Sequence, residues 1–139
     1  MKPNKSEGRV YARSIEALEA VFAHADEFFR SHDVDPQTSF AVKLAIEEIF
    51  TNFVKYNPDG SDGILVDMQR KGGEIVARLV DPDSGEFDVT EYDKVDTSSQ
   101  LDKRMAGGLG IFLVKKMVDD VQYHHSDRTS TIVLTKKMG

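Results

Sequence analysis

Three glycines stand in the stretch GGLG, residues 107–110, just before a segment with helical periodicity. Glycines at a helix N-terminus let backbone N–H groups approach an anion closely, so this loop could hold phosphate groups. Neither a GK[ST] ending nor a third glycine in G-x-G-x-x-G spacing follows, which excludes two familiar nucleotide loops. A plain glycine hinge explains the same letters equally well.

An acid and an amide stand four residues apart in EEIFTNFVKYNP, residues 47–58. In a helix, Glu48 and Asn52 share one stripe, which Ala41 and Ala45 continue toward the N-terminus. Small side chains leave room along such a stripe for a ligand. A solvated helix edge, with Glu48 exposed and Asn52 without a role, is the competing interpretation.

The stretch VDPDSGEFD, residues 80–88, follows a predicted strand and is rich in carboxylates. A calcium loop is excluded, because its glycine falls one place early and Tyr92 stands at the twelfth position. An aspartate at the end of a strand can instead accept a hydrogen bond from an exocyclic amine such as that of adenine. An ordinary turn is the alternative. The histidines lack partners at metal-ligand spacing, so no function is assigned to His24, His32, His124 or His125.

Two helices are predicted in the first half of the chain, after a short edge strand at RVYAR, residues 9–13. Ser14 is the predicted cap of the first helix, whose apolar residues repeat at helical spacing: Ile15, Leu18, Phe22, Ala25 and Phe29. Asp35 and Pro36 begin the second helix, which NPDG ends. Its apolar stripe comprises Val42, Ile46, Ile49 and Phe53.

In the second half of the chain, apolar and polar residues alternate with a period of two, which is typical of strands. A first hairpin is predicted from GILVDMQRK and EIVARLVD, which pair through a turn at Gly72 and Gly73. A second hairpin is predicted from VQYHH and TSTIVLTKK, joined by a turn at SDRT. Between the hairpins, residues 82–106 show no period and are expected to be a lid, followed by a helix with Ile111, Val114 and Val118 on one face. This order predicts an α+β fold, a two-layer α/β sandwich with a mostly antiparallel sheet and helices on one face.

Composition limits the classes of function. The 139 residues include 18 basic and 24 acidic ones, net charge -6, without a basic run, so we expect one domain and no direct nucleic-acid binding. The absence of cysteine excludes disulfides and thiol chemistry and fits a reducing compartment. The first ten residues lack the apolar core of a signal peptide, and no stretch approaches the roughly 20 apolar residues that span a bilayer. We expect a cytoplasmic protein without membrane association.

Four segments in order, EEIFTN, VDPDSGEFD, GGLGIFLVKKMVDDVQY and TIVLTK, resemble the motifs of the GHKL ATPase superfamily. Within it, the chain is most similar to the bacterial anti-sigma-factor serine kinases. The resemblance implies a Bergerat-type ATP-binding fold over residues 1–139, with ATP and Mg²⁺ as cofactors. It implies phosphorylation of a serine on a small anti-anti-sigma partner of the STAS type, with a sigma factor as the competing partner. A homodimer is left open.

The resemblance also implies roles for individual residues. Glu48 would be the general base, Asn52 the Mg²⁺ ligand, and either Asp81 or Asp83 the adenine contact. Further contacts to the nucleotide would come from Gly85, Gly107, Gly108, Leu109, Gly110 and Thr131. Mg²⁺ prefers hard oxygen ligands, and asparagine offers one without adding charge beside ATP.

Two other classes of function remain as alternatives. A non-catalytic ATP-binding module that switches partners is favoured by two departures from the family pattern. Asp81 and Asp83 stand at other distances from Phe87 and Asp88 than in the family pattern. Phe53 and Tyr56 replace the residues that usually follow the asparagine at position 52. A detached histidine-kinase catalytic domain is disfavoured because no helix carries a phospho-accepting histidine.

Overall fold

The computed structural model describes residues 7–56, 63–82 and 114–139. In chain order its elements are β1 (Glu7–Tyr11), the 3-10 helix η1 (Ile15–Ala17), α1 (Leu18–Ser31), α2 (Pro36–Tyr56), β2 (Ile64–Lys71), β3 (Glu74–Asp81), β4 (Asp120–Ser126) and β5 (Thr129–Lys137). Residues 114–117 add one helical turn before β4. The predicted order of elements is therefore confirmed within these ranges.

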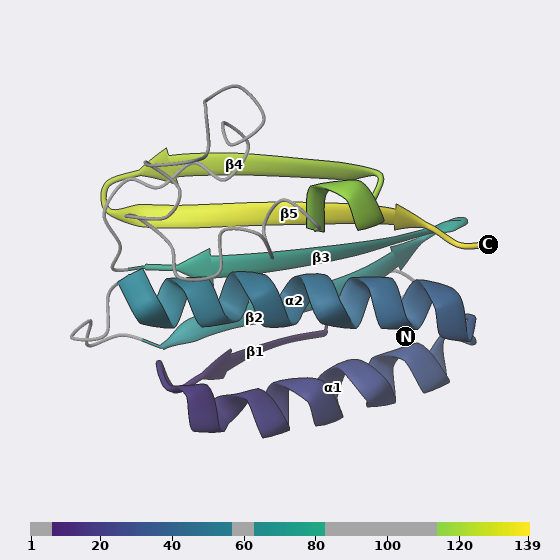
Figure 1. The fold of residues 1–139 in the computed structure, drawn as a ribbon, viewed down its shortest axis with the longest axis horizontal. Coiled ribbons are helices and arrows are strands. Elements are labelled where there is room, and N and C mark those ends of the chain that lie inside the picture. The colour runs from purple at the N-terminus through teal and green to yellow at the C-terminus, as the bar shows by residue number, and fades with distance from the viewer. Residues whose placement is uncertain (1–6, 57–62, 83–113) are drawn as a thin grey trace.

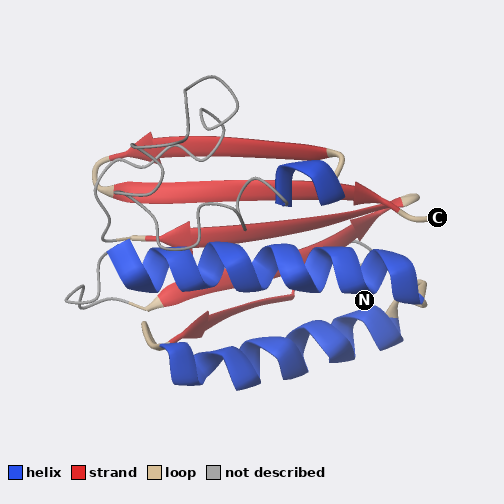
Figure 2. Ribbon diagram, viewed as in Figure 1, coloured by secondary structure: helices blue, strands red, loops and turns tan. Residues whose placement is uncertain are grey.

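The strands form one five-stranded sheet in the order β1-β2-β3-β5-β4. Every neighbouring pair is antiparallel, and β1 is an edge strand as predicted. Helices α1 and α2 lie side by side on one face, α1 against β1 and β2 and α2 against β3 and β5 (Figures 1 and 2). The predicted α+β architecture with helices on one face is thus confirmed.

Helix α2 begins and packs as its sequence predicts. The carboxylate Oδ2 of Asp35 accepts a hydrogen bond from the backbone N–H of Thr38 at 3.0 Å, which satisfies one of the open donors of the first turn. Pro36 occupies the first helical position, where no N–H is required. The predicted apolar stripe is buried throughout: Val42, Ile46, Ile49 and Phe53.

The start of α1 differs from the prediction, and its buried face agrees with it only at Ala25 and Phe29, with Leu18 packed against the core. Ser14 makes no side-chain cap hydrogen bond, because a 3-10 turn follows it and α1 itself begins only at Leu18. This short turn shifts the phase of the helix by a fraction of a turn. Ile15 is therefore exposed and Phe22 only half-buried. The buried face consists of Val21, His24, Ala25, Phe28 and Phe29.

Alternation along the strands separates the two faces of the sheet. On β3, the residues that point toward the helices are Ile75, Ala77, Leu79 and Asp81, and on β5 they are Ser130, Ile132 and Leu134. These positions pair across the two strands, so they form one continuous surface. Two polar residues, Asp81 and Ser130, end this otherwise apolar surface.

The β2–β3 turn depends on glycine at one of its two positions. Gly72 has φ +59°, in the left-handed region, whereas the φ of Gly73 lies outside it. A Cβ at either position would meet nothing within 4 Å, so only the backbone conformation distinguishes them. The β4–β5 turn adopts positive φ without glycine, at Asp127 and Arg128.

We expect Gly72→Ala to lower the free energy of unfolding by about 1 to 2 kcal/mol, because alanine is strained in the left-handed region. Gly73→Ala is the matched control and should be neutral or slightly stabilising, since it restricts only the unfolded chain. Urea unfolding of the two variants measures the difference. Equal losses in both would contradict a turn strained only at Gly72.

Candidate functional site

One end of the sheet gathers polar residues from distant parts of the chain. The C-terminal end of α2, the ends of β3 and β4 and the start of β5 all lie at the same side of the molecule (Figure 1). Asn52 comes from α2, Asp81 from β3 and Ser130 from β5. All three side chains belong to buried residues, which is unusual for polar groups unless each has a partner or a ligand.

The stripe that carries Glu48 and Asn52 is not a solvated helix edge. Ala41, Ala45 and Asn52 are 6%, 0% and 2% exposed, and Glu48 is half-buried. The acid and the amide are therefore held on rigid helix, one turn apart, with small side chains beside them. Of the two interpretations left open by the sequence, a ligand-facing stripe agrees with this burial.

The amide of Asn52 carries an unsatisfied donor. Among the described residues, its Nδ2 is buried and has no hydrogen-bond partner. A buried donor without a partner typically costs about 1 to 3 kcal/mol. Such a group is tolerated where it serves a ligand, and an amide that holds a cation through Oδ1 can donate through Nδ2 to an anion.

The carboxyl group of Glu48 is less acidic than an ordinary glutamate. Partial burial raises the pKa of Glu48, the neighbouring Glu47 carboxylate raises it further, and Lys55 opposes the two. A carboxylate accepts a proton from a weakly acidic hydroxyl more readily as its own pKa rises. The environment therefore suits the general-base role that the resemblance implies.

Asp81 is held by an ion pair buried under the helices. Asp81 is 0% exposed. Nη1 of Arg13 donates to Oδ2 of Asp81 at 3.0 Å, and Nη2 of Arg13 donates to Oδ1. The Arg13 side chain is 3% exposed. A carboxylate has about four acceptor positions, so two donors from arginine leave capacity for a third group. This bidentate contact fixes the plane of the carboxylate.

Ser130, rather than Thr131, shares a face with Asp81. The register pairs Asp81 with Ser130 and Val80 with Thr131, so Thr131 points to the opposite face of the sheet. Ser130 is fully buried and its hydroxyl lies 3.1 Å from Nδ1 of His125. The resemblance implied Thr131 beside the adenine, but the hydroxyl that lies beside Asp81 in this fold is that of Ser130.

The other expected site residues lie outside the described residues. They are Asp83, Gly85, Gly107, Gly108, Leu109 and Gly110, together with all of the expected 82–106 lid after Pro82. The described part of the site therefore consists of Glu48, Asn52 and Asp81 from the sequence analysis, with Arg13 and Ser130 added by the structure. No local sequence pattern indicated Arg13. Ser130 could have been identified by assigning alternate residues of the TSTIVLTKK strand to opposite faces of the sheet.

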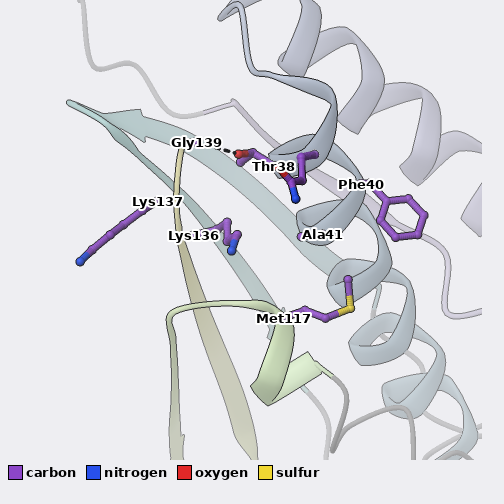
Figure 3. Close-up of a pocket in the computed structure, with 8 residues that line it drawn as sticks. Thr38, Phe40, Ala41, Met117, Lys136, Lys137 and Gly139 are labelled. Carbon is purple, nitrogen blue, oxygen red and sulfur yellow. Dashed lines mark hydrogen bonds between the residues drawn. The ribbon is translucent and has the colours of Figure 1, made fainter.

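Two hollows among the described residues lie away from these groups. The larger, of about 360 Å³, is beside the first turns of α2 and is lined by residues including Thr38, Ala41, Met117 and Lys136 (Figure 3). Gly139 also lines it and donates its backbone N–H to Oγ1 of Thr38 at 3.4 Å. The second hollow lies between Phe22 and Phe40. Neither includes Glu48, Asn52 or Asp81.

Two further features are absent from the described ranges, a membrane-spanning helix and a cluster of metal ligands. No helix there is long and apolar enough to cross a membrane. No group of three or more His, Cys, Asp or Glu residues in those ranges could hold a metal ion by itself. A cation at Asn52 would need further oxygen ligands, because one amide oxygen does not complete its coordination shell.

Sequence comparison relates the chain to nucleotide-binding kinases. Residues 11–136 match the histidine kinase-like ATPase domain family. The serine-protein kinase RsbW of Listeria monocytogenes serovar 1/2a (strain ATCC BAA-679 / EGD-e) is 31% identical over 101 residues, and RsbW of serotype 4a (strain HCC23) is 29% identical. The matched region is 68% of this chain and 63% of each relative, so the chain spans less than two thirds of their length.

Two solved structures share the fold. The RsbU and RsbW domains of Rv1364c from Mycobacterium tuberculosis match with a TM-score of 0.71 at 19% identity, covering 96% of this chain and 32% of that one. The SiaB–SiaC complex from Pseudomonas aeruginosa matches with a TM-score of 0.67 at 13% identity, covering 94% and 87%. At these identities the likeness concerns the fold alone.

Arg13→Ala should destabilise the protein by about 3 to 5 kcal/mol, because it leaves the Asp81 carboxylate buried without its countercharge. The matched control is Arg9→Ala. Arg9 pairs with Glu27 at 3.3 Å, but these side chains are 54% and 55% exposed, so the loss should stay below about 1 kcal/mol. Urea unfolding measures both, and Asp81→Asn in the Arg13→Ala background should recover part of the loss. Similar losses in the two arginine variants would contradict the buried pair.

Glu48→Gln should stabilise the ligand-free protein at neutral pH. The pKa of Glu48 is higher in the folded than in the unfolded chain, so ionisation disfavours folding. This cost is absent below the ordinary glutamate pKa of about 4.3 and grows as pH rises through the folded pKa. The melting temperature of the variant should thus exceed that of the unmodified chain near pH 7 and converge with it in acid. Glu47→Gln, which removes only the smaller cause, should give a smaller gain, and a pH-independent difference would contradict the assignment.

Proposed function

Because the chain belongs to the histidine kinase-like ATPase domain family, we propose that it is an anti-sigma regulator that binds Mg-ATP and phosphorylates a serine on a partner. The partner would be a small anti-anti-sigma domain of the STAS type, and a sigma factor would compete for the kinase. Asn52, Glu48 and Asp81 would carry the described part of the site.

The comparisons support this proposal through what the similar proteins are. The Listeria relatives are named serine-protein kinases, and one structural neighbour is a complex of SiaB with SiaC. Those activities and assemblies belong to the relatives. For this chain, which spans 63% of their length, kinase activity and partner are part of the proposal.

The observation that carries the proposal is the buried Asn52 amide beside Glu48. Asn52 would hold Mg²⁺ through Oδ1, and its Nδ2, which has no partner within the described ranges, would donate to a phosphate oxygen. When bound, Mg²⁺ would neutralise charge on the phosphate oxygens during transfer. Glu48, whose pKa is raised by burial, would accept the proton of the attacking serine hydroxyl.

The base of the nucleotide would be recognised at the end of β3. Asp81 would accept a hydrogen bond from the exocyclic amine of adenine, with Arg13 fixing the orientation of its carboxylate. Asp81 is favoured over Asp83 because it belongs to a strand, while Asp83 follows in the predicted turn. The phosphates would contact the glycines of residues 107–110.

One observation favours the non-catalytic partner-switching module as a second candidate. Phe53 is 3% exposed and packs in the core, at a position where the family pattern has a small residue. A large side chain next to Asn52 could change the angle at which α2 presents its polar stripe. Such a module would bind nucleotide and partner and transfer no phosphate.

Glu48 and Asn52 should separate chemistry from binding. Glu48→Ala should keep the melting-temperature rise that Mg-ADP produces and slow partner phosphorylation by about 10² to 10⁴, because a base acts only during transfer. Asn52→Ala should lose both the magnesium-dependent rise and transfer. The measurements are thermal melts with Mg-ADP and incubation of labelled ATP with proteins that copurify from the native host.

Glu47→Ala is the matched control, because a rotation of about 100° per residue directs Glu47 away from Asn52. If Glu47→Ala abolished transfer and Glu48→Ala did not, the base would be misassigned. Labelled serine supports the kinase, and labelled histidine would indicate a histidine kinase. Nucleotide binding with no transfer by the unmodified chain would favour the partner-switching module.

A further inference from the structure

The Arg13–Asp81 pair joins the first strand of the chain to the proposed adenine contact. Arg13 stands two residues after the end of β1, and Asp81 is the last residue of β3. The ends of these two strands lie at the same side of the molecule, but β2 separates the strands in the sheet (Figure 1). The bidentate contact therefore ties the start of the chain to a site that its own strand does not border.

The N-terminal segment, residues 8–17, contributes little to the apolar core. β1 lies at the edge of the sheet, where β2 is its neighbour. None of the apolar residues in the segment is fully buried, and Val10 and Ile15 are exposed. The Arg13 side chain, in contrast, is almost fully buried. A polar contact rather than apolar packing therefore fixes this segment at the site.

Undocking of the N-terminal segment should cost less than unfolding of the sheet, because little apolar surface would leave the core. Two side-chain contacts with α1 would be lost, the exposed pair of Arg9 with Glu27 and the hydrogen bond between the Tyr11 hydroxyl and His24 at 2.7 Å. A third loss falls at the site. Without Arg13, the Asp81 carboxylate lacks its countercharge and two charge-assisted hydrogen bonds.

Recognition of adenine by Asp81 depends on the same contact. An amine donates a strong hydrogen bond only when the acceptor lies near the direction of its N–H. The guanidinium of Arg13 holds the plane of the carboxylate, and it does so only while the N-terminal segment is docked. A nucleotide whose amine contacts Asp81 therefore binds the docked state in preference to the undocked state.

We infer that the Arg13–Asp81 pair couples nucleotide binding to docking of the N-terminal segment, so that this segment regulates the proposed site. The inference rests on the proposed ATP-binding function and adds a regulatory element to it. Because coupling between two equilibria is reciprocal, a bound adenine nucleotide holds β1 in the sheet, and a partner that draws β1 away lowers the affinity for nucleotide.

The test follows hydrogen exchange of the full chain by mass spectrometry, with and without Mg-ADP, after calorimetry has given the Kd. A ligand that binds only the docked state suppresses undocking by the factor 1 + [L]/Kd. At about 100 times the Kd, the amides of residues 7–13 should therefore exchange about 10- to 100-fold more slowly. Residues 120–122 of β4 are the internal control, since they lie on the opposite edge of the sheet, and their exchange should change by less than about 2-fold.

A ligand control requires no variant to fold. IDP carries an oxygen where ADP carries the exocyclic amine, so it presents an acceptor to a carboxylate that can only accept. At concentrations that give the same saturation as ADP, IDP should slow exchange in residues 7–13 by less than about 2-fold. Equal slowing by the two nucleotides would show that the coupling does not pass through Asp81, and would overturn the inference.

Two matched variants test the arginine itself. Arg13→Lys retains a positive charge beside Asp81, but a single ammonium cannot hold the plane of the carboxylate. The slowing of exchange that ADP produces in residues 7–13 should fall at least about 5-fold in this variant. Arg9→Lys makes the same replacement in the same segment, at an exposed ion pair, and should keep the full effect.

The outcomes separate this inference from the proposed function. ADP binding without slower exchange in residues 7–13, or equal slowing in Arg13→Lys and Arg9→Lys, would overturn the coupling and leave nucleotide binding intact. If the unmodified chain bound no ADP, the proposed function would fail and this inference with it.

Discussion

The packing of α2 across β3 and β5 is the interaction on which the rest of the structure depends. One stripe of the helix, formed by residues such as Ile46 and Ile49, supplies the centre of the core. The adjacent stripe is set by the same rotation of the helix and brings Asn52 into the interior. Stability and site geometry are therefore coupled, because no rotation of α2 could expose Asn52 without lifting apolar residues from the sheet.

Polar burial at one end of this core is costly. Asn52 has a buried donor without a partner among the described residues, Glu48 has a raised pKa, and Asp81 needs the Arg13 countercharge. Each feature opposes folding or requires a specific partner. His24, which is buried beside Phe28, also has a polar partner, the Tyr11 hydroxyl at 2.7 Å from its Nδ1. Three such costs at one end of the sheet are better explained by ligand recognition than by stability.

Much of this arrangement could be predicted from the sequence, for physical reasons that differ by element. Helix α2 was predictable because its apolar period extends over 21 residues between a capping aspartate and NPDG. The phase of α1 was not, because the 3-10 turn before it uses three residues per turn and displaces the stripe. The Arg13–Asp81 pair joins residues 68 positions apart, and no local pattern carries such a contact.

The register of the last hairpin has the largest effect on the chemistry of the site. A shift of one residue along β5 exchanges Ser130 for Thr131, and the same shift along β4 exchanges His125 for His124. Motif resemblance matches residue types within a segment and does not determine which side of a strand they occupy. Strand pairing determines that side, because Arg13 already fixes the position of Asp81. Only residues of β5 and β4 that are in register with Asp81 share its face of the sheet. The hydroxyl that lies beside Asp81 therefore follows from strand pairing.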